Sequence, residues 1–138
     1  MPAADSPVFA AFRIDAGTYV AYSNQRGLKR VIAAFGYSWK GLRSTFRHEE
    51  AFRQELLLVA ILVPAAFWLT DVGLERALLI GSLFLILIVE LLNSGIEAAI
   101  DRFGGEIHKL SARAKDMGSA AVLLSFVNAG VIWLVVLL

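Results

Sequence analysis

Three long apolar runs constrain this chain of 138 residues more than any other feature. Their apolar cores lie at residues 56–69, 77–100 and 117–138. A helix rises about 1.5 Å per residue, so about 20 residues cross the roughly 30 Å hydrocarbon core of a bilayer. Because lipid offers no partners to backbone N–H and C=O groups, so short a chain can span a bilayer only as helices. We predict an all-α membrane protein with three transmembrane helices, at about residues 51–70, 77–100 and 117–138.

The basic residues predict how these spans are oriented. Eight of the 13 lysines and arginines precede the first apolar core, and four lie between the second and third spans. Only Arg76 lies beside the connection between spans one and two. By the positive-inside rule, the N-terminus and the loop at 101–116 are cytoplasmic and the C-terminus faces outward. The first 30 residues lack the apolar segment of a signal peptide, so we expect the spans to direct insertion.

A further helix is predicted at about residues 28–48, before the first span. Its apolar residues fall at helical spacing on one stripe, and the basic residues lie off it: Leu28, Val31, Ile32, Phe35, Trp39, Leu42 and Phe46. This pattern is typical of an amphipathic helix in the cytoplasmic headgroup layer. The alternative is a helix packed against a soluble partner. Residues 1–27 form an N-terminal extension to which the sequence assigns no role.

Glu90 lies within the second apolar run and is the strongest candidate for function. A carboxylate at that depth costs about 2.5 kcal/mol or more, so it marks a functional site by default. Asn93, Glu97 and Asp101 follow at spacings of three, seven and eleven residues, which places all four on one helix face leading to the cytoplasm. The alternative is an interhelical hydrogen bond made by a protonated Glu90.

Carboxylates are also numerous where the spans meet the cytoplasm: Glu49, Glu50, Glu55, Glu97, Asp101, Glu106 and Asp116. Facing carboxylates suit Mg²⁺, which takes one or two of them together with water and phosphate oxygens. Nearby bases are placed to neutralise phosphate: Lys40, Arg43, Arg113 and Lys115. For any one of the acidic residues, the alternative is a solvated surface with loose ion pairs.

Several other classes of site are excluded or disfavoured. The chain has no cysteine, so disulfides and thiolate chemistry are excluded. It has neither a GxxxxGK[ST] loop nor a GxGxxG turn, so a nucleotide would be held by groups on helices. Gly95 and Gly118, with small residues around them, predict close helix packing and no chemistry.

Four strings carry a resemblance to a known family: GYSWKGLR (36–43), EAFRQE (50–55), VELLNSGIEAAIDR (89–102) and LSARAKDMGSAAVL (110–123). They resemble the prokaryotic diacylglycerol kinases, small integral membrane lipid kinases, and the similarity covers roughly residues 28–138. The resemblance implies a homotrimer in the bacterial inner membrane. It also implies transfer of the γ-phosphoryl group of Mg-ATP to the hydroxyl of diacylglycerol, which gives phosphatidic acid.

The resemblance also implies roles for individual residues. Glu90 matches the catalytic base and Asn93 a polar residue beside it, while Glu49 and Glu97 match the carboxylates that hold the metal ions. The implied nucleotide site includes both of these carboxylates and further positions: Arg30, Tyr37, Glu106, His108, Lys115 and Asp116. The implied lipid-substrate positions are Trp39, Arg43, Phe52, Glu55 and Ser119. Ile107 departs from the aromatic residue expected at its position.

Competing interpretations remain open from the residues alone. A polyprenol kinase acting on undecaprenol would use the same chemistry on another lipid alcohol. A proton- or cation-coupled transporter would also place Glu and Asn on one face of a span, although the internal repeats or interrupted helices of transporters are not evident in the sequence. A non-catalytic membrane adaptor would use the basic helix as a lipid anchor and would leave Glu90 unexplained.

Overall fold

The computed structural model describes residues 27–102 and 108–138, and these residues form four α-helices. The helices are α3 (Leu28–His48), α4 (Glu50–Leu69), α5 (Gly73–Asp101) and α6 (Lys109–Leu137). The all-α prediction is confirmed, and α4, α5 and α6 are each long and apolar enough to cross a membrane. The chain divides into two units, residues 1–41 and 42–138, and the three long apolar helices belong to the second.

Helix α3 has the amphipathic pattern predicted for it. It begins after Gly27, whose φ of 68° lies in the left-handed region that favours glycine. The apolar stripe is exposed along its length, with Leu28 at 75%, Phe35 at 74% and Trp39 at 67% exposure. An exposed apolar stripe on a helix with basic residues off the stripe is suited to a membrane surface.

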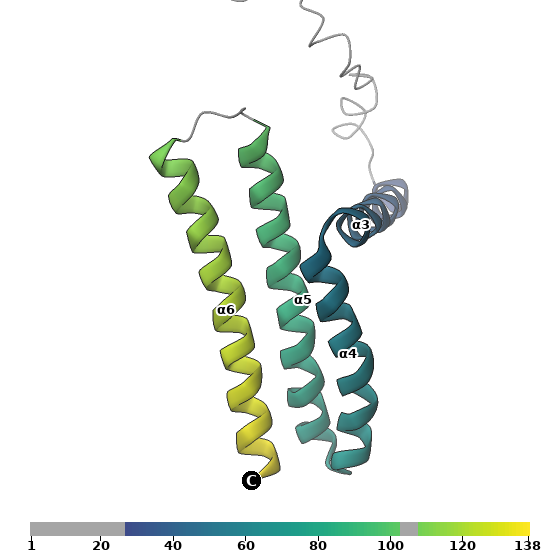
Figure 1. Ribbon diagram of the computed structural model, residues 1–138. Helices are drawn as coiled ribbons and strands as arrows, with labels where there is room; N and C mark the ends of the chain where they lie inside the picture. Colours follow the sequence, from purple (N-terminus) through teal and green to yellow (C-terminus); the bar gives the residue numbers. More distant parts are fainter. Residues whose placement is uncertain (1–26, 103–107) are drawn as a thin grey trace, which may run out of the picture. The chain divides into compact units, whose positions relative to one another are not determined.

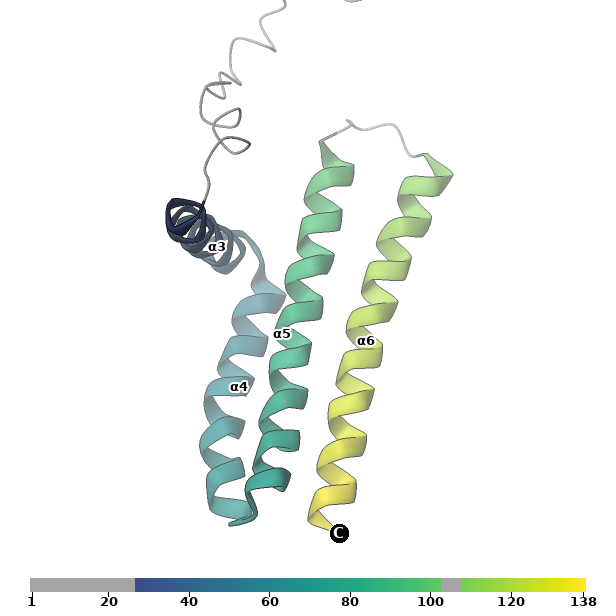
Figure 2. The ribbon, with the colours of Figure 1, turned by 180° about the vertical axis from the view of Figure 1, so that it is seen from behind.

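Helices α4, α5 and α6 make up the second unit apart from the end of α3, and α5 packs against both of the others (Figures 1 and 2). On α5, Leu79, Leu83 and Ile86 are at most 1% exposed, at a spacing that places them on one face. Between α5 and α6, Trp133 Nε1 donates a hydrogen bond to the Leu79 carbonyl at 3.3 Å. The core of the unit therefore centres on α5, the helix that carries Glu90.

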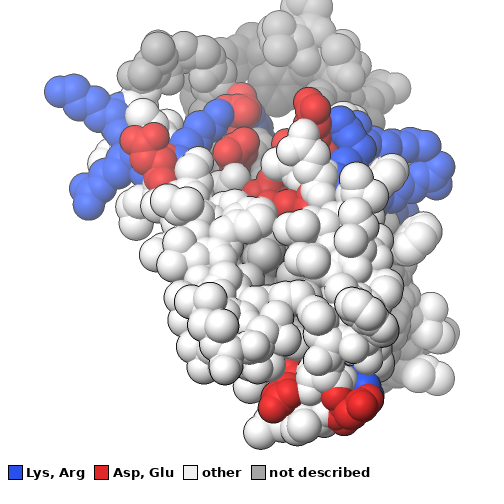
Figure 3. Space-filling model, turned by 60° about the horizontal axis from the view of Figure 1, so that its bottom comes forward, with Lys and Arg blue, Asp and Glu red and all other residues white. Residues whose placement is uncertain are grey.

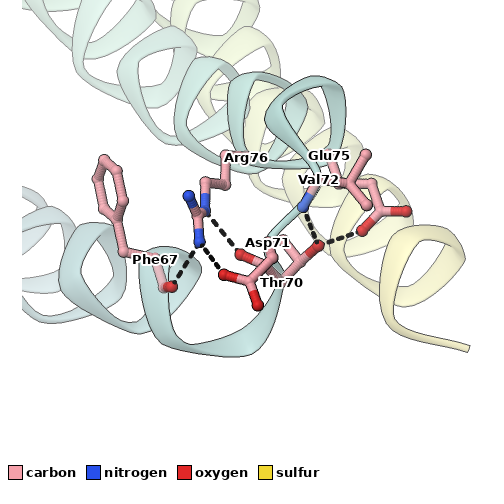
Figure 4. A network of polar contacts seen from close by, with 6 residues as sticks. All are labelled: Phe67, Thr70, Asp71, Val72, Glu75 and Arg76. Atoms are coloured by element: carbon pink, nitrogen blue, oxygen red, sulfur yellow. Dashed lines mark hydrogen bonds and ion pairs between the residues drawn. The ribbon is translucent and has the colours of Figure 1, made fainter.

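The turn between α4 and α5 is fixed by Arg76 (Figure 4). Its Nε donates to the Thr70 carbonyl at 2.6 Å, and its Nη2 donates to the Phe67 carbonyl at 3.1 Å and to Asp71 Oδ1 at 2.7 Å. The guanidinium also lies 5.3 Å from the centre of the Phe67 ring. Thr70 Oγ1 donates to Glu75. Because the last carbonyls of a helix have no partner within it, Arg76 supplies donors that α4 lacks at its end.

Helix α6 begins at Lys109, eight residues before the start expected at 117. The expectation followed the uncharged run, whereas Ala, Leu, Lys and Arg before that run are all good helix formers. His108 stabilises the new start, because its Nδ1 accepts a hydrogen bond from the Leu110 N–H at 3.2 Å. The cytoplasmic loop predicted at 101–116 is therefore shorter, and its residues 103–107 lie outside the described part of the chain.

The surface of the three-helix unit is consistent with a membrane span. On the face shown in Figure 3, Asp and Glu side chains gather towards its two ends, and most of the surface between them is uncharged. Large apolar side chains point outward there, including Ile61 at 60% and Leu124 at 67% exposure. Such surfaces are stable against lipid or against another apolar protein surface.

Candidate active site

Glu90 is buried at the centre of the candidate site, with 4% of its surface exposed. It lines a cavity of about 450 Å³ to which α4, α5 and α6 all contribute. The other lining residues are Ala51, Gln54, Glu55 and Leu58 of α4, and Val122 and Phe126 of α6. The cavity therefore combines two carboxylates and one amide with an otherwise apolar wall.

Glu55 is the second carboxylate of this cavity and is 6% exposed. It lines the same cavity as Glu90, from the neighbouring helix α4. Its Oε2 is buried and has no hydrogen-bond partner among the described residues. A buried polar atom without a partner costs free energy, so this oxygen is an acceptor that the hydroxyl group of a ligand can satisfy.

Two further carboxylates, Glu49 and Glu97, lie close enough to Glu90 for their charges to act on it. Glu49 precedes α4 as its N-cap residue, but its side chain makes no capping hydrogen bond. Glu97 Oε1 accepts a hydrogen bond from Asn93 Nδ2 at 3.2 Å. These two residues of the predicted polar stripe therefore contact each other directly. Glu49 and Glu97 thus add their negative charges to the surroundings of Glu90.

This donor set fits a magnesium ion. Within residues 27–102 and 108–138, no group of three His, Cys, Asp or Glu residues is arranged to hold a metal. Mg²⁺ needs fewer protein ligands than that, because one or two carboxylates suffice when water and phosphate oxygens fill the other positions. Glu49 and Glu97 are the two carboxylates that the resemblance implies for such a site, and the charges of both act on Glu90.

Lys115 supplies a positive charge beside the carboxylates. Its Nζ lies 2.6 Å from Asp101 Oδ1, and this ion pair links α6 to α5. The charge of Glu97 also acts on Lys115. The two side chains of the pair are 38% and 64% exposed. Exposed ion pairs are worth little, so Lys115 can exchange Asp101 for a phosphate oxygen at small cost. The adjacent Asp116 is exposed.

The other predicted site residues lie in several different parts of the chain. Arg30, Tyr37 and Trp39 belong to the unit of residues 1–41, and Glu106 lies outside the described residues. Phe52 is buried in the core of the three-helix unit. Exposed positions are Arg43 on α3, Ser119 on α6, and His108, which caps α6. The structure thus brings together Glu49, Glu55, Glu90, Asn93 and Glu97.

Sequence reasoning missed the apolar wall of the cavity, formed by Leu58, Val122 and Phe126. One signal was available, since Gly118, Val122 and Ser125 recur at i, i+4 and i+7 and so mark the inner face of α6. A spacing of this kind identifies a face. It does not show that a cavity lies beneath it.

The fold and the cavity define a class of protein: a small helical membrane protein whose buried carboxylates line a cavity with an apolar wall. The family model for prokaryotic diacylglycerol kinase matches residues 36–137. The diacylglycerol kinase of Escherichia coli (strain K12) is 52% identical over 115 residues, which cover 83% of this chain and 94% of that protein. The diacylglycerol kinase of Pseudomonas aeruginosa is 50% identical over 117 residues, or 85% of this chain and 95% of the relative. The diacylglycerol kinase of Haemophilus influenzae is 45% identical over 107 residues, which cover 78% of this chain and 91% of that protein.

The chain belongs to the prokaryotic diacylglycerol kinase family. It is therefore a lipid kinase with ATP as its co-substrate and a bacterial membrane protein. The resemblance found in the four sequence strings is confirmed.

Proposed function

We propose that this chain transfers the γ-phosphoryl group of Mg-ATP to the free hydroxyl of diacylglycerol, releasing phosphatidic acid and ADP. The observation that carries the proposal is the pair of buried carboxylates, Glu55 and Glu90, in a cavity with an apolar wall. A lipid alcohol has an apolar body and one polar hydroxyl, and this cavity offers both environments side by side.

Glu90 acts as the general base in this proposal. The hydroxyl oxygen of the lipid attacks the γ-phosphorus, the bond from that phosphorus to the β-γ bridging oxygen breaks, and ADP leaves. The hydroxyl proton passes to the Glu90 carboxylate. Glu55 lines the same cavity, and its unpartnered Oε2 keeps the wall polar where the hydroxyl lies, while the single hydroxyl proton is directed to Glu90.

Glu49 and Glu97 would hold magnesium, which supplies neutralisation of the charge on the phosphates when it is bound. Asn93 orients Glu97 through its hydrogen bond. Lys115 and Asp116 on α6 bind the nucleotide, together with further family-matched positions: Arg30, Tyr37, Glu106 and His108. Phosphoryl transfer depends chiefly on positioning and charge neutralisation, which these helix-borne groups supply.

The lipid occupies the apolar side of the site. Leu58, Val122 and Phe126 line the cavity next to the carboxylates and suit the first carbon atoms of its chains. Further lipid contacts are proposed at the family-matched positions Trp39, Arg43, Phe52 and Ser119. The amphipathic helix α3 lies in the headgroup layer, where the hydroxyl of diacylglycerol is found.

We further propose that the protein is a homotrimer in the inner membrane, with its N-terminus in the cytoplasm and its C-terminus in the periplasm. The distribution of Lys and Arg supports this orientation. The exposed apolar surfaces of α4, α5 and α6 support contacts with other subunits or with lipid. Residues 28–138 form the kinase domain in this proposal, and residues 1–27 an extension outside it.

The proposal is tested by transfer of labelled phosphate from ATP to diacylglycerol in mixed micelles containing Mg²⁺. Glu90→Gln keeps the size of the side chain and removes the base, so we expect kcat to fall by about 10²-fold or more. The matched control is Glu50→Gln, which changes an exposed carboxylate of α4 and leaves kcat unchanged. Full activity in folded Glu90→Gln protein would exclude its role as the base.

A second arm of the assay offers undecaprenol in place of diacylglycerol, since a polyprenol also joins one hydroxyl to an apolar chain. We expect diacylglycerol to have the higher kcat/KM. If only undecaprenol is phosphorylated, the acceptor is a polyprenol. If neither lipid is phosphorylated by the wild-type protein, the proposed function is wrong.

A further inference from the structure

Gly118 of α6 faces Asn93 of α5 at very close range. A Cβ atom added at Gly118 would lie 2.1 Å from Asn93 Oδ1 and 3.2 Å from Asn93 Cγ, well inside normal contact distances. The four other glycines of these two helices, Gly73, Gly81, Gly95 and Gly130, would meet nothing within 4 Å. Gly118 is also a helical residue without a positive φ, so space and not backbone conformation accounts for glycine here.

The Asn93 side chain occupies the space that Gly118 leaves. Its Nδ2 donates to Glu97 Oε1 at 3.2 Å, and its Oδ1 is buried without a hydrogen-bond partner among the described residues. A buried amide oxygen without a partner is unfavourable. The hydrogen bonds of the amide alone therefore do not explain its position. The bond to Glu97 and the gap at Gly118 together define the position.

We propose that Gly118 is a positioning residue for phosphoryl transfer. The missing side chain allows the Asn93 amide to lie between α5 and α6, where it holds the Glu97 carboxylate in one orientation. This inference rests on the proposed function, in which Glu97 binds the metal of Mg-ATP. It assigns Gly118 a role beyond the close helix packing that its small size predicts.

Alanine at position 118 separates this role from ordinary packing. The atom that the new methyl group meets is the far end of a flexible side chain, so Asn93 can rotate away without movement of the α5 backbone. Alanine also favours a helix more than glycine does. Gly118→Ala should therefore leave the fold intact and disturb the bond between Asn93 and Glu97. If Gly118 were needed only for close packing of the helices, Gly118→Ala would instead lower the stability of the protein.

The first measurement compares Gly118→Ala with Gly130→Ala on α6 and Gly81→Ala on α5 in the micelle assay. We expect Gly118→Ala to lower kcat/KM for Mg-ATP by about 10- to 100-fold, the range for loss of one hydrogen bond to a charged group. Its Tm should be unchanged or higher. The two control variants should keep wild-type kinetics. Wild-type kinetics in Gly118→Ala would overturn the proposal.

The second measurement combines Gly118→Ala with Asn93→Ala. Once Asn93 is shortened, the new methyl group has no amide to displace, so the double variant should have the same kcat/KM as Asn93→Ala alone. If the two losses multiply, Gly118 acts through something other than Asn93 and the proposal fails.

A third measurement keeps this proposal separable from the proposed function. The rise in Tm caused by Gly118→Ala should be larger in the Asn93→Ala protein than in the wild type, because only the wild type must move the amide. This comparison needs no activity, so it remains informative even if the wild type phosphorylates no lipid. Equal changes in Tm would show that Gly118 and Asn93 do not make the close contact.

Discussion

Arg76→Ala tests whether the turn between α4 and α5 is held mainly by bonds to the backbone. The substitution removes two hydrogen bonds to the Phe67 and Thr70 carbonyls, the ion pair with Asp71, and the contact with the Phe67 ring (Figure 4). The Arg76 side chain is 27% exposed, whereas that of Asp71 is 104% exposed. The bonds from Arg76 to the two carbonyls should therefore contribute more to the free energy of unfolding than its ion pair with Asp71.

The magnitude follows from these environments. A hydrogen bond with a charged partner contributes about 1.5–3 kcal/mol, but water can replace part of it at an exposed helix end. We therefore assign about 1 kcal/mol to each bond with a carbonyl. The exposed ion pair adds about 0.2–1 kcal/mol and the ring contact about 0.5–1 kcal/mol. Arg76→Ala should thus lower the free energy of unfolding by about 3–4 kcal/mol.

The assay is unfolding of the three-helix unit in mixed micelles by titration with a denaturing detergent, followed by circular dichroism. Asp71→Asn removes only the exposed ion pair and should cost about 0.5 kcal/mol. Arg76→Lys keeps the charge but loses the planar fork of donors, so its cost should be intermediate. Activity per folded molecule should not change, because Arg76 and Glu90 are 14 residues apart on α5, or about 21 Å along the helix.

Two results would contradict a turn held mainly by the bonds from Arg76 to the backbone. If Asp71→Asn costs as much as Arg76→Ala, the ion pair and not the backbone bonds holds the turn. If Arg76→Ala leaves the free energy of unfolding unchanged, water replaces the guanidinium fully and the end of α4 does not need it.

Two further predictions concern the site and the core. Glu97→Gln removes one of the two proposed metal carboxylates, so it should raise the Mg²⁺ concentration needed for half-maximal activity by about tenfold or more. The Tm should stay near the wild-type value. An unchanged Mg²⁺ requirement would show that Glu97 is not a metal ligand. Trp133→Phe deletes the indole N–H that bonds to the Leu79 carbonyl and should cost about 0.6–1.5 kcal/mol in free energy of unfolding without lowering kcat. A large loss of kcat in that variant would link the far half of α6 to the site.

Most of the helical architecture could be predicted from the sequence. The apolar runs identified α4, α5 and α6, and the spacing from Leu28 to Phe46 identified α3. These predictions succeed because helix formation in a bilayer depends on local composition and period. The start of α6 was missed because helix propensity continues through charged residues that hydropathy treats as a loop.

The site was predictable only in part. The spacing of Glu90, Asn93 and Glu97 placed them on one face of a single helix, and the bond between Asn93 and Glu97 agrees with that placement. Glu49 and Glu55 stood out only as two of seven carboxylates near the cytoplasmic boundary, and family resemblance supplied their individual roles. Sequence reasoning alone did not show that Glu55 and Glu90 line the same cavity.

Local composition and periodicity specify which segments are helices, which of them can cross a membrane, and which carboxylate is costly to bury. Which faces meet is seen only in the folded molecule: Glu55 lines the same cavity as Glu90, 35 positions along the chain, and Gly118 lies against Asn93, 25 positions away. Helical period fixes only a residue's face within its own helix. The rotation and axial shift of one helix against the next are set by side-chain packing along the whole contact.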